Sequence, residues 1–160
     1  MRLAIIAAGR LKQGPERTLA DDYLKRAEGL GRGCGISRIA ITEFNESQAS
    51  SAAQRLAEEG RQMAAALPGK SFAVALDERG KALTSADFAS LLRRQLEGGV
   101  ADMAFLIGGP DGHAPAIREK AALTMSFGPM TWPHRLVRVM LLEQIYRAIT
   151  ILAGHPYHRV

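Results

Sequence analysis

The last seven residues of the chain, GHPYHRV, carry side chains that could move a proton and hold a phosphate. His155 and His158 carry imidazoles, which exchange protons near neutral pH, and Arg159 carries a guanidinium, which binds phosphate well. Chain ends are usually frayed and chemically plain, so this composition is unusual. We therefore predict that the tail is ordered and packs beside a ligand-binding cleft, of its own subunit or of a partner.

A charged pair lies in the last predicted helix, at residues 134–153. Glu143 and Arg147 are four residues apart, which places them on one helix face in the orientation that favours an ion pair. Most other positions of this helix are apolar, so the pair indicates an interface or a site rather than an ordinary surface bridge. The apolar character also predicts burial on several sides, with a second subunit covering the helix.

Glycine and proline gather in two loops that follow consecutive predicted strands. GGPDG follows the strand at residues 102–108, and GPMTWP follows the strand at 122–127. Ligands of open α/β sheets bind beyond the carboxyl ends of the strands, and glycine lets the backbone approach a ligand closely. Together with the Leu-Asp end of the preceding strand, the two loops predict a ligand-binding cleft at one edge of the sheet.

Common nucleotide and metal motifs do not fit this chain. A dinucleotide-binding fingerprint needs three spaced glycines after the first strand, which here ends in the lone Gly9, and no Lys-Ser/Thr follows the later glycines as a P-loop requires. His155 and His158 have no nearby carboxylate or cysteine to complete a zinc site. We expect no metal.

Strand and helix patterns alternate along the chain. The predicted strands cover residues 3–8, 36–44, 71–77, 102–108 and 122–127. The first predicted helix begins at residue 15. The other predicted helices cover residues 47–67, 84–97, 115–121 and 134–153. Thr84 and Asp87 form a capping-box-like start, and ERGK before them is interpreted as a turn. The order predicts an α/β fold with a parallel sheet and helices on both faces.

Length and composition limit the class of protein. A chain of 160 residues, 47% hydrophobic, suits one compact domain spanning residues 1–160. The single cysteine, Cys34, excludes an internal disulfide, and the apolar start is too short for a secretory signal. No apolar run approaches the roughly 18 residues of a membrane span. We expect a soluble, cytoplasmic protein that does not bind membranes.

The net charge of +5 is unevenly distributed. Residues 1–40 hold eight Lys/Arg and four Asp/Glu, residues 113–160 hold six and two, and residues 41–112 hold seven and ten. If the two basic ends meet in the fold, they form one basic face that suits a polyanion such as RNA.

Three motifs in combination resemble the RlmH family of SPOUT-class methyltransferases. They are LIGGPDG after a strand, WPHRLVRVMLLEQIYRA after a proline-rich loop, and HPYHR at the end of the chain. The resemblance covers essentially the full length. It implies a homodimer with a SPOUT-type α/β fold whose C-terminal segment forms a deep trefoil knot, a rare exception to unknotted topology.

The resemblance also implies a reaction. Such an enzyme uses S-adenosyl-L-methionine to methylate N3 of a pseudouridine in large-subunit (23S) ribosomal RNA, on the assembled ribosome. Because a sulfonium methyl is already electrophilic, the protein mainly aligns donor and acceptor, and a base helps to remove the acceptor proton.

Site residues follow from the same resemblance. Those implied for the cofactor cleft are Leu76, Gly108, Gly109, Gly128, Pro129, Met130, Thr131, Trp132 and Pro133. The candidates for the base are His155, His158 and Glu143. Tyr157, Arg147 and Arg159 would orient the base or its phosphate.

Two alternatives stay open at this point. One is a SPOUT-like methyltransferase that acts on another RNA. The other is a basic RNA-binding or assembly protein without catalysis, which would not bind S-adenosylmethionine.

Overall fold

A computed structural model describes residues 1–157 of the chain. The strands are β1 (Arg2–Ala8), β2 (Arg38–Phe44), β3 (Phe72–Ala82), β4 (Asp102–Ile107) and β5 (Leu123–Ser126). The helices are α1 (Pro15–Gly31), α2 (Ala52–Ala66), α3 (Ser85–Glu97), α4 (Pro115–Lys120) and α5 (His134–Leu152), with a 3₁₀ turn η1 (Arg32–Cys34) after α1.

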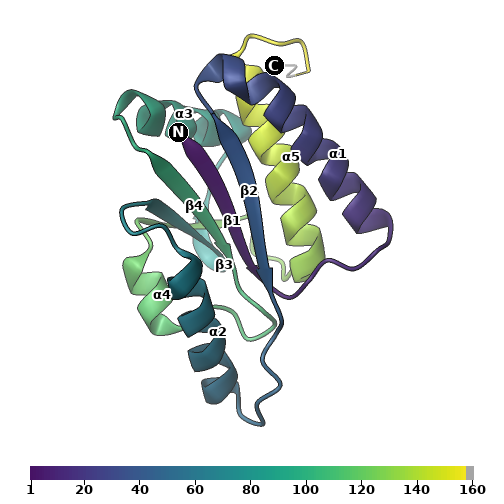
Figure 1. The fold of residues 1–160 in the computed structure, drawn as a ribbon, viewed down its shortest axis with the longest axis vertical. Coiled ribbons are helices and arrows are strands. Elements are labelled where there is room, and N and C mark those ends of the chain that lie inside the picture. The colour runs from purple at the N-terminus through teal and green to yellow at the C-terminus, as the bar shows by residue number, and fades with distance from the viewer. Residues whose placement is uncertain (158–160) are drawn as a thin grey trace.

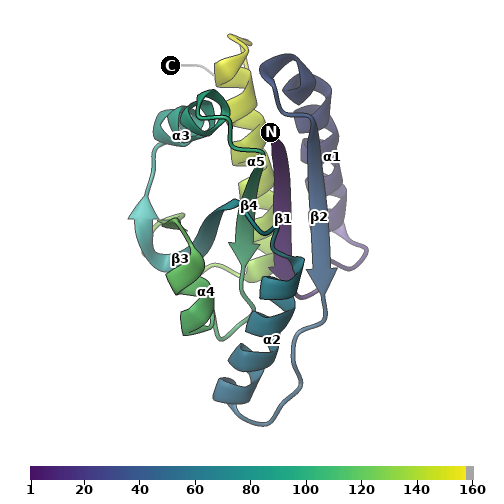
Figure 2. The same cartoon turned by 60° about the vertical axis from the view of Figure 1, so that its left-hand side comes forward.

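The five strands form one parallel sheet in the order β2-β1-β4-β3-β5. Helices α1, α3 and α5 cover one face, and α2 and α4 cover the other (Figures 1 and 2). This arrangement confirms the predicted α/β class and parallel sheet. Because the strands are parallel, their carboxyl ends lie together at one edge, where ligands bind in such folds.

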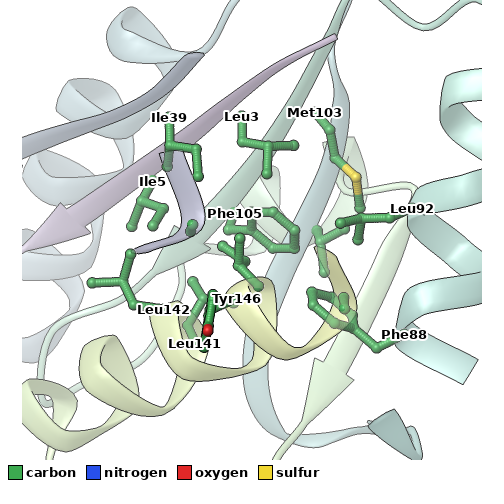
Figure 3. Packing of buried hydrophobic residues seen from close by; sticks show 14 of the residues in the cluster. Leu3, Ile5, Ile39, Phe88, Leu92, Met103, Phe105, Leu141, Leu142 and Tyr146 are labelled. Atoms are coloured by element: carbon green, nitrogen blue, oxygen red, sulfur yellow. The ribbon is translucent and has the colours of Figure 1, made fainter. Parts of the chain in front are cut away.

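Side chains alternate between two hydrophobic clusters on the two faces of the sheet. On β1, Leu3 and Ile5 point into the cluster under α1, α3 and α5, whereas Ile6 points into the smaller cluster under α2 and α4. Figure 3 shows the larger cluster, where Phe105 of β4 packs between the sheet and the buried face of α5. The near-continuous apolar runs of these strands follow from burial on both faces.

β3 is longer than predicted. The residues ERGK, interpreted above as a turn, continue the strand to Ala82, and Lys81 and Ala82 pair with β5 after a register shift beyond Leu76. Gly80 permits this pairing, since a Cβ there would lie only 2.6 Å from the carbonyl carbon of Met125. Gly80 therefore serves a close approach of two strands rather than a turn.

Capping side chains determine where α3 and α2 begin. Thr84 and Asp87 form the predicted capping box at the start of α3. α2 begins at Ala52 rather than at the predicted residue 47, because the Ser51 hydroxyl accepts the Gln54 N–H as the N-cap.

α5 is buried mainly by its own chain. Leu141, Leu142 and Ile145 are fully buried, and α1 and α3 pack along the helix. Within one chain, α1, α3 and the sheet thus bury much of this apolar helix, and the expectation that a second subunit also covers it stays a prediction. Packing of α1 on α5 also brings the two basic ends of the chain together, whereas the single basic face that they would form stays a prediction. Within residues 1–157, no helix is both long and apolar enough to cross a membrane.

The start of α5 is attached to the sheet by a buried cation. Arg138 is 1% exposed, forms an ion pair with Glu43 at the end of β2, and donates to the Gly9 carbonyl oxygen at 2.9 Å. These contacts link the ends of β1 and β2 to α5, beside the carboxyl edge of the sheet.

Candidate functional site

A cleft of about 530 Å³ lies at the carboxyl edge of the sheet. Its walls are the middle of β3 at the register shift beyond Leu76, the loop after β4, the loop after β5 and the first turn of α5. Eight of the nine residues implied for the cofactor cleft line it: Leu76, Gly108, Gly109, Gly128, Met130, Thr131, Trp132 and Pro133. The ninth, Pro129, is exposed and does not line the cleft.

The loop after β4 is a tight turn held from both sides. Gly112 donates its N–H to the Gly109 carbonyl oxygen at 2.9 Å. A Cβ on Gly108 would lie 2.4 Å from the Gly112 carbonyl oxygen, so only glycine allows this turn to close. Arg55 of α2 clamps the tip through a two-point ion pair with Asp111, at 2.6 and 3.0 Å. Its hydrogen bond lowers the pKa of Asp111.

The loop after β5 is fixed at its start and open at its tip. The buried Ser126 hydroxyl accepts the Gly128 N–H at 3.0 Å, and Thr131 donates its hydroxyl to Glu78 at 2.9 Å. In contrast, Met130 is 68% exposed and Trp132 is 39% exposed. These two large apolar side chains stand at the mouth of the cleft and are available to pack on a ligand or a partner.

The middle of β3 is held by a buried histidine that no sequence motif indicated. His113 is 3% exposed, and its Nε2 lies 2.9 Å from the Leu76 carbonyl oxygen. Burial lowers the pKa of His113, so the ring is neutral at physiological pH and donates its Nε2–H to that oxygen.

Several residues outside the set implied for the cofactor also line the cleft. Asp77, Glu78, Phe127, His134 and Val137 all line the cleft. Asp77 ends the predicted third strand, whose Leu-Asp end was expected to contribute to the cleft, and Glu78 directly follows it, so their place at its carboxyl end was a usable signal. His134 directly follows Pro133 of the predicted cleft loop and Val137 lies one helical turn later, so their place in the sequence was a signal as well.

The predicted pair in α5 forms a second polar cluster with the tail. Arg147 donates to Glu143 at 2.6 and 2.9 Å, which raises the pKa of Arg147 and confirms the predicted ion pair. The Tyr157 hydroxyl donates to the same Glu143 oxygen at 3.3 Å, and the Arg147 guanidinium lies 5.0 Å from the centre of the Tyr157 ring. Burial raises the pKa of Tyr157 to about 12.

Tyr157 also packs against Tyr146 with the ring centres 4.7 Å apart, and His155 Nδ1 accepts the Tyr157 N–H at 3.2 Å. The tail is thus ordered at least to Tyr157. His158 and Arg159 lie outside the described residues.

The cleft and the tail lie at opposite ends of α5. The helix begins at the cleft with His134, ends at Leu152 beside the tail, and spans about 27 Å at 1.5 Å per residue. Figure 1 shows the tail at the end of α5 that lies away from the arrowheads of β1 and β2. Within one subunit, therefore, His155 and Tyr157 do not pack beside the loops after β4 and β5.

Metal ligands do not gather in the described part of the chain. Among residues 1–157, no group of three or more His, Cys, Asp or Glu side chains is arranged to hold a metal ion.

Comparisons with known proteins point to one family. A family model described as "Predicted SPOUT methyltransferase" matches residues 1–158. The chain is 56% identical to the "Ribosomal RNA large subunit methyltransferase H" of Bradyrhizobium diazoefficiens over 159 residues, which is 99% of each chain. It is 55% identical to the protein of the same name from Nitrobacter winogradskyi, again over 99% of each chain. Among solved structures, a probable methyltransferase from Bordetella pertussis aligns with a TM-score of 0.49 and 12% identity, over 92% of this chain and 95% of that one.

Proposed function

The chain belongs to the SPOUT methyltransferase family, and we propose that it transfers a methyl group from S-adenosyl-L-methionine to large-subunit ribosomal RNA. The relatives that share more than half of its residues carry this activity in their names. We propose N3 of a pseudouridine on the assembled ribosome as the acceptor, as the motif resemblance implies. One observation carries the proposal: the residues that the resemblance assigns to the cofactor gather around one cleft.

The cleft has the size and chemistry for this cofactor. Its volume lies within the range of about 300–1,000 Å³ that is typical of small-molecule sites. The glycine loop after β4 presents bare backbone, and Leu76, Met130 and Trp132 present apolar surface suited to an adenine ring. S-adenosylmethionine would supply an electrophilic methyl group on a sulfonium. The loops would hold the donor and align it with the acceptor nitrogen.

We assign removal of the acceptor proton to the polar cluster that Glu143 and Arg147 form with the tail. Tyr157, with its pKa raised to about 12, stays protonated and donates to Glu143 rather than acting as a base. Glu143 already accepts hydrogen bonds from Arg147, Tyr157 and Gln144, so it acts as a holder of these groups. We therefore propose a tail histidine, His155 or His158, as the base, with Arg147 and Arg159 binding RNA phosphate.

Completion of the site requires a homodimer. Because tail and cleft lie at opposite ends of α5, we propose that the tail of one subunit completes the cleft of its partner. Large exposed apolar side chains support a dimer face near the cleft: Leu136 in the first turn of α5 is 38% exposed, and Met130 and Trp132 lie at the cleft mouth. Soluble monomers seldom leave such a patch open.

We also propose a domain organisation, a cellular location and a chain topology. The chain is one domain over residues 1–160, it acts in the cytoplasm, and it needs neither metal nor membrane. The C-terminal segment forms the trefoil knot. Its path supports this, since β5 lies at one edge of the sheet whereas the next element, α5, packs against α1, which lies over the opposite edge beside β2.

The test combines binding and transfer. Calorimetric titration with S-adenosylmethionine should show binding, and ribosomes from cells that lack the modification should then accept labelled methyl groups at a single pseudouridine. Absence of binding would favour a non-catalytic RNA-binding protein. Binding together with methylation of a different RNA would favour another substrate.

A further inference from the structure

Glu59 of α2 is a buried carboxylate directly behind the cleft. The residue is 5% exposed. A Cβ placed on Gly109 would lie 2.8 Å from Glu59 Oε2, so the carboxylate contacts the backbone of a residue that lines the cleft. Little more than the Gly109 backbone separates this charge from a ligand in the cleft.

One oxygen of this carboxylate has no hydrogen-bond donor in the described chain. Oε1 accepts the Ser47 N–H at 3.0 Å, whereas Oε2 is buried and has no partner among residues 1–157. Arg55, one turn earlier on α2, donates to Asp111 instead. A buried carboxylate oxygen without a donor is costly, so its presence beside a ligand cleft points to a use for its charge.

The other charges on the cleft wall are mainly negative. Asp77, Glu78 and Asp111 line the cleft together with one cation, Arg79; Asp111 is paired with Arg55, and the Asp77 side chain is only 8% exposed. Arg79 and Arg118 approach Asp77 at 3.7 and 4.0 Å, but their side chains are 77% and 39% exposed. In a chain of net charge +5, this acidic wall has the sign opposite to the whole molecule.

On the basis of the function proposed above, we propose that Glu59, aided by Asp77 and Glu78, makes the cleft select the cationic methyl donor over its uncharged-sulfur product. During transfer, the electron pair of the acceptor nitrogen forms the new N–C bond. The C–S bond breaks with its electron pair remaining on sulfur, and the N3 proton passes to the base.

The sulfonium charge disappears in this step, so S-adenosylhomocysteine carries one positive charge fewer than the donor. A negative cleft attracts the sulfonium and offers the neutral sulfur no such attraction. Glu59 therefore acts as a specificity residue through the Gly109 backbone, and favours the exchange of product for fresh donor.

The variant Glu59→Gln tests this, because it removes the charge and keeps both the shape and an oxygen that accepts the Ser47 N–H. Calorimetry on the full-length protein should show the affinity for S-adenosylmethionine falling about tenfold, or about 1.4 kcal/mol, while the affinity for S-adenosylhomocysteine changes less than about threefold. Glu58→Gln is the matched control. It removes the same charge from the neighbouring position of α2, where Glu58 accepts from the Ser47 hydroxyl, and should leave the ratio of the two affinities unchanged.

The ratio of affinities separates a charge effect from a structural one. An equal loss for both ligands, or no change for either, would overturn the proposal. Failure of the wild type to bind either ligand would instead overturn the proposed function. If thermal melting shows Glu59→Gln unfolded, the wild type is titrated with a donor analogue that carries an ammonium in place of the sulfonium. Binding tighter than that of the product supports the proposal, and equal or weaker binding overturns it.

Discussion

The glycine turn after β4 provides a sharp test of the cleft, because position 108 has no room for a side chain. In Gly108→Ala, the new Cβ would lie 2.4 Å from the Gly112 carbonyl oxygen and 2.7 Å from its carbonyl carbon, whereas ordinary contact begins near 3.4 Å. The obstacle is backbone and cannot rotate away, so the turn must open by about 1 Å.

The cost of this opening should appear mainly in ligand binding. Overpacking of this kind costs about 1–3 kcal/mol, and the exposed tip at Pro110 lets the turn move without disturbing the sheet. A displacement of about 1 Å at a donor-binding backbone can cost about 10²-fold in rate. We therefore expect Gly108→Ala to lower the affinity for S-adenosylmethionine at least about tenfold, and methyl transfer by more, with a modest drop in melting temperature.

Calorimetry and transfer of labelled methyl groups to unmodified ribosomes measure the two effects. Gly69→Ala is the control, since a Cβ at this exposed position meets nothing within 4 Å. If Gly108→Ala bound the donor with wild-type affinity, the turn would not be part of the donor site.

Three further perturbations address other parts of the molecule. Arg138→Met should lower the free energy of unfolding by about 3 kcal/mol in urea titrations, since it leaves Glu43 without its buried partner, and adding Glu43→Gln should recover part of the loss. Burial lowers the pKa of His113 below its ordinary 6.5, so the unfolded chain binds this proton more readily and stability falls as the pH drops below about 6.5. His113→Gln should remove the part of the stability loss in acid that protonation of His113 causes. Identical melting curves for the wild type and the variant from pH 7 to 5 would contradict this account. Deletion of residues 155–160 should leave folding and dimerisation nearly intact, lower donor affinity modestly at most and abolish methyl transfer, whereas wild-type transfer would place the base elsewhere.

Much of the fold was predictable because its causes are local. Apolar runs fixed the five strands to within a few residues, and the Thr84–Asp87 capping box marked the start of α3. The extension of β3 was missed because Gly80 is compatible with a turn and with a close strand pair, and only the position of β5 decides between them.

The cleft was predictable from the topological rule that the loops of parallel strands meet at one edge. The placement of the tail was not. Spacing shows that Glu143 and Arg147 pair, but the distance from Tyr157 to the cleft depends on the length and direction of α5. Glu59 lies in an ordinary-looking amphipathic helix, and its burial becomes visible only when Gly109 packs against it.

The separation of cleft and tail along α5 has a consequence for mixtures of defective subunits. In the proposed dimer, a Gly108→Ala subunit keeps its tail and a tail-deleted subunit keeps its cleft, so the first homodimer has strongly reduced activity and the second has none. A heterodimer of the two holds one intact cleft completed by one intact tail. Equal mixing with random subunit exchange should therefore restore about a quarter of the wild-type sites. If each tail served the cleft of its own subunit, no mixing ratio would restore activity, and complementation between the two chains would be absent.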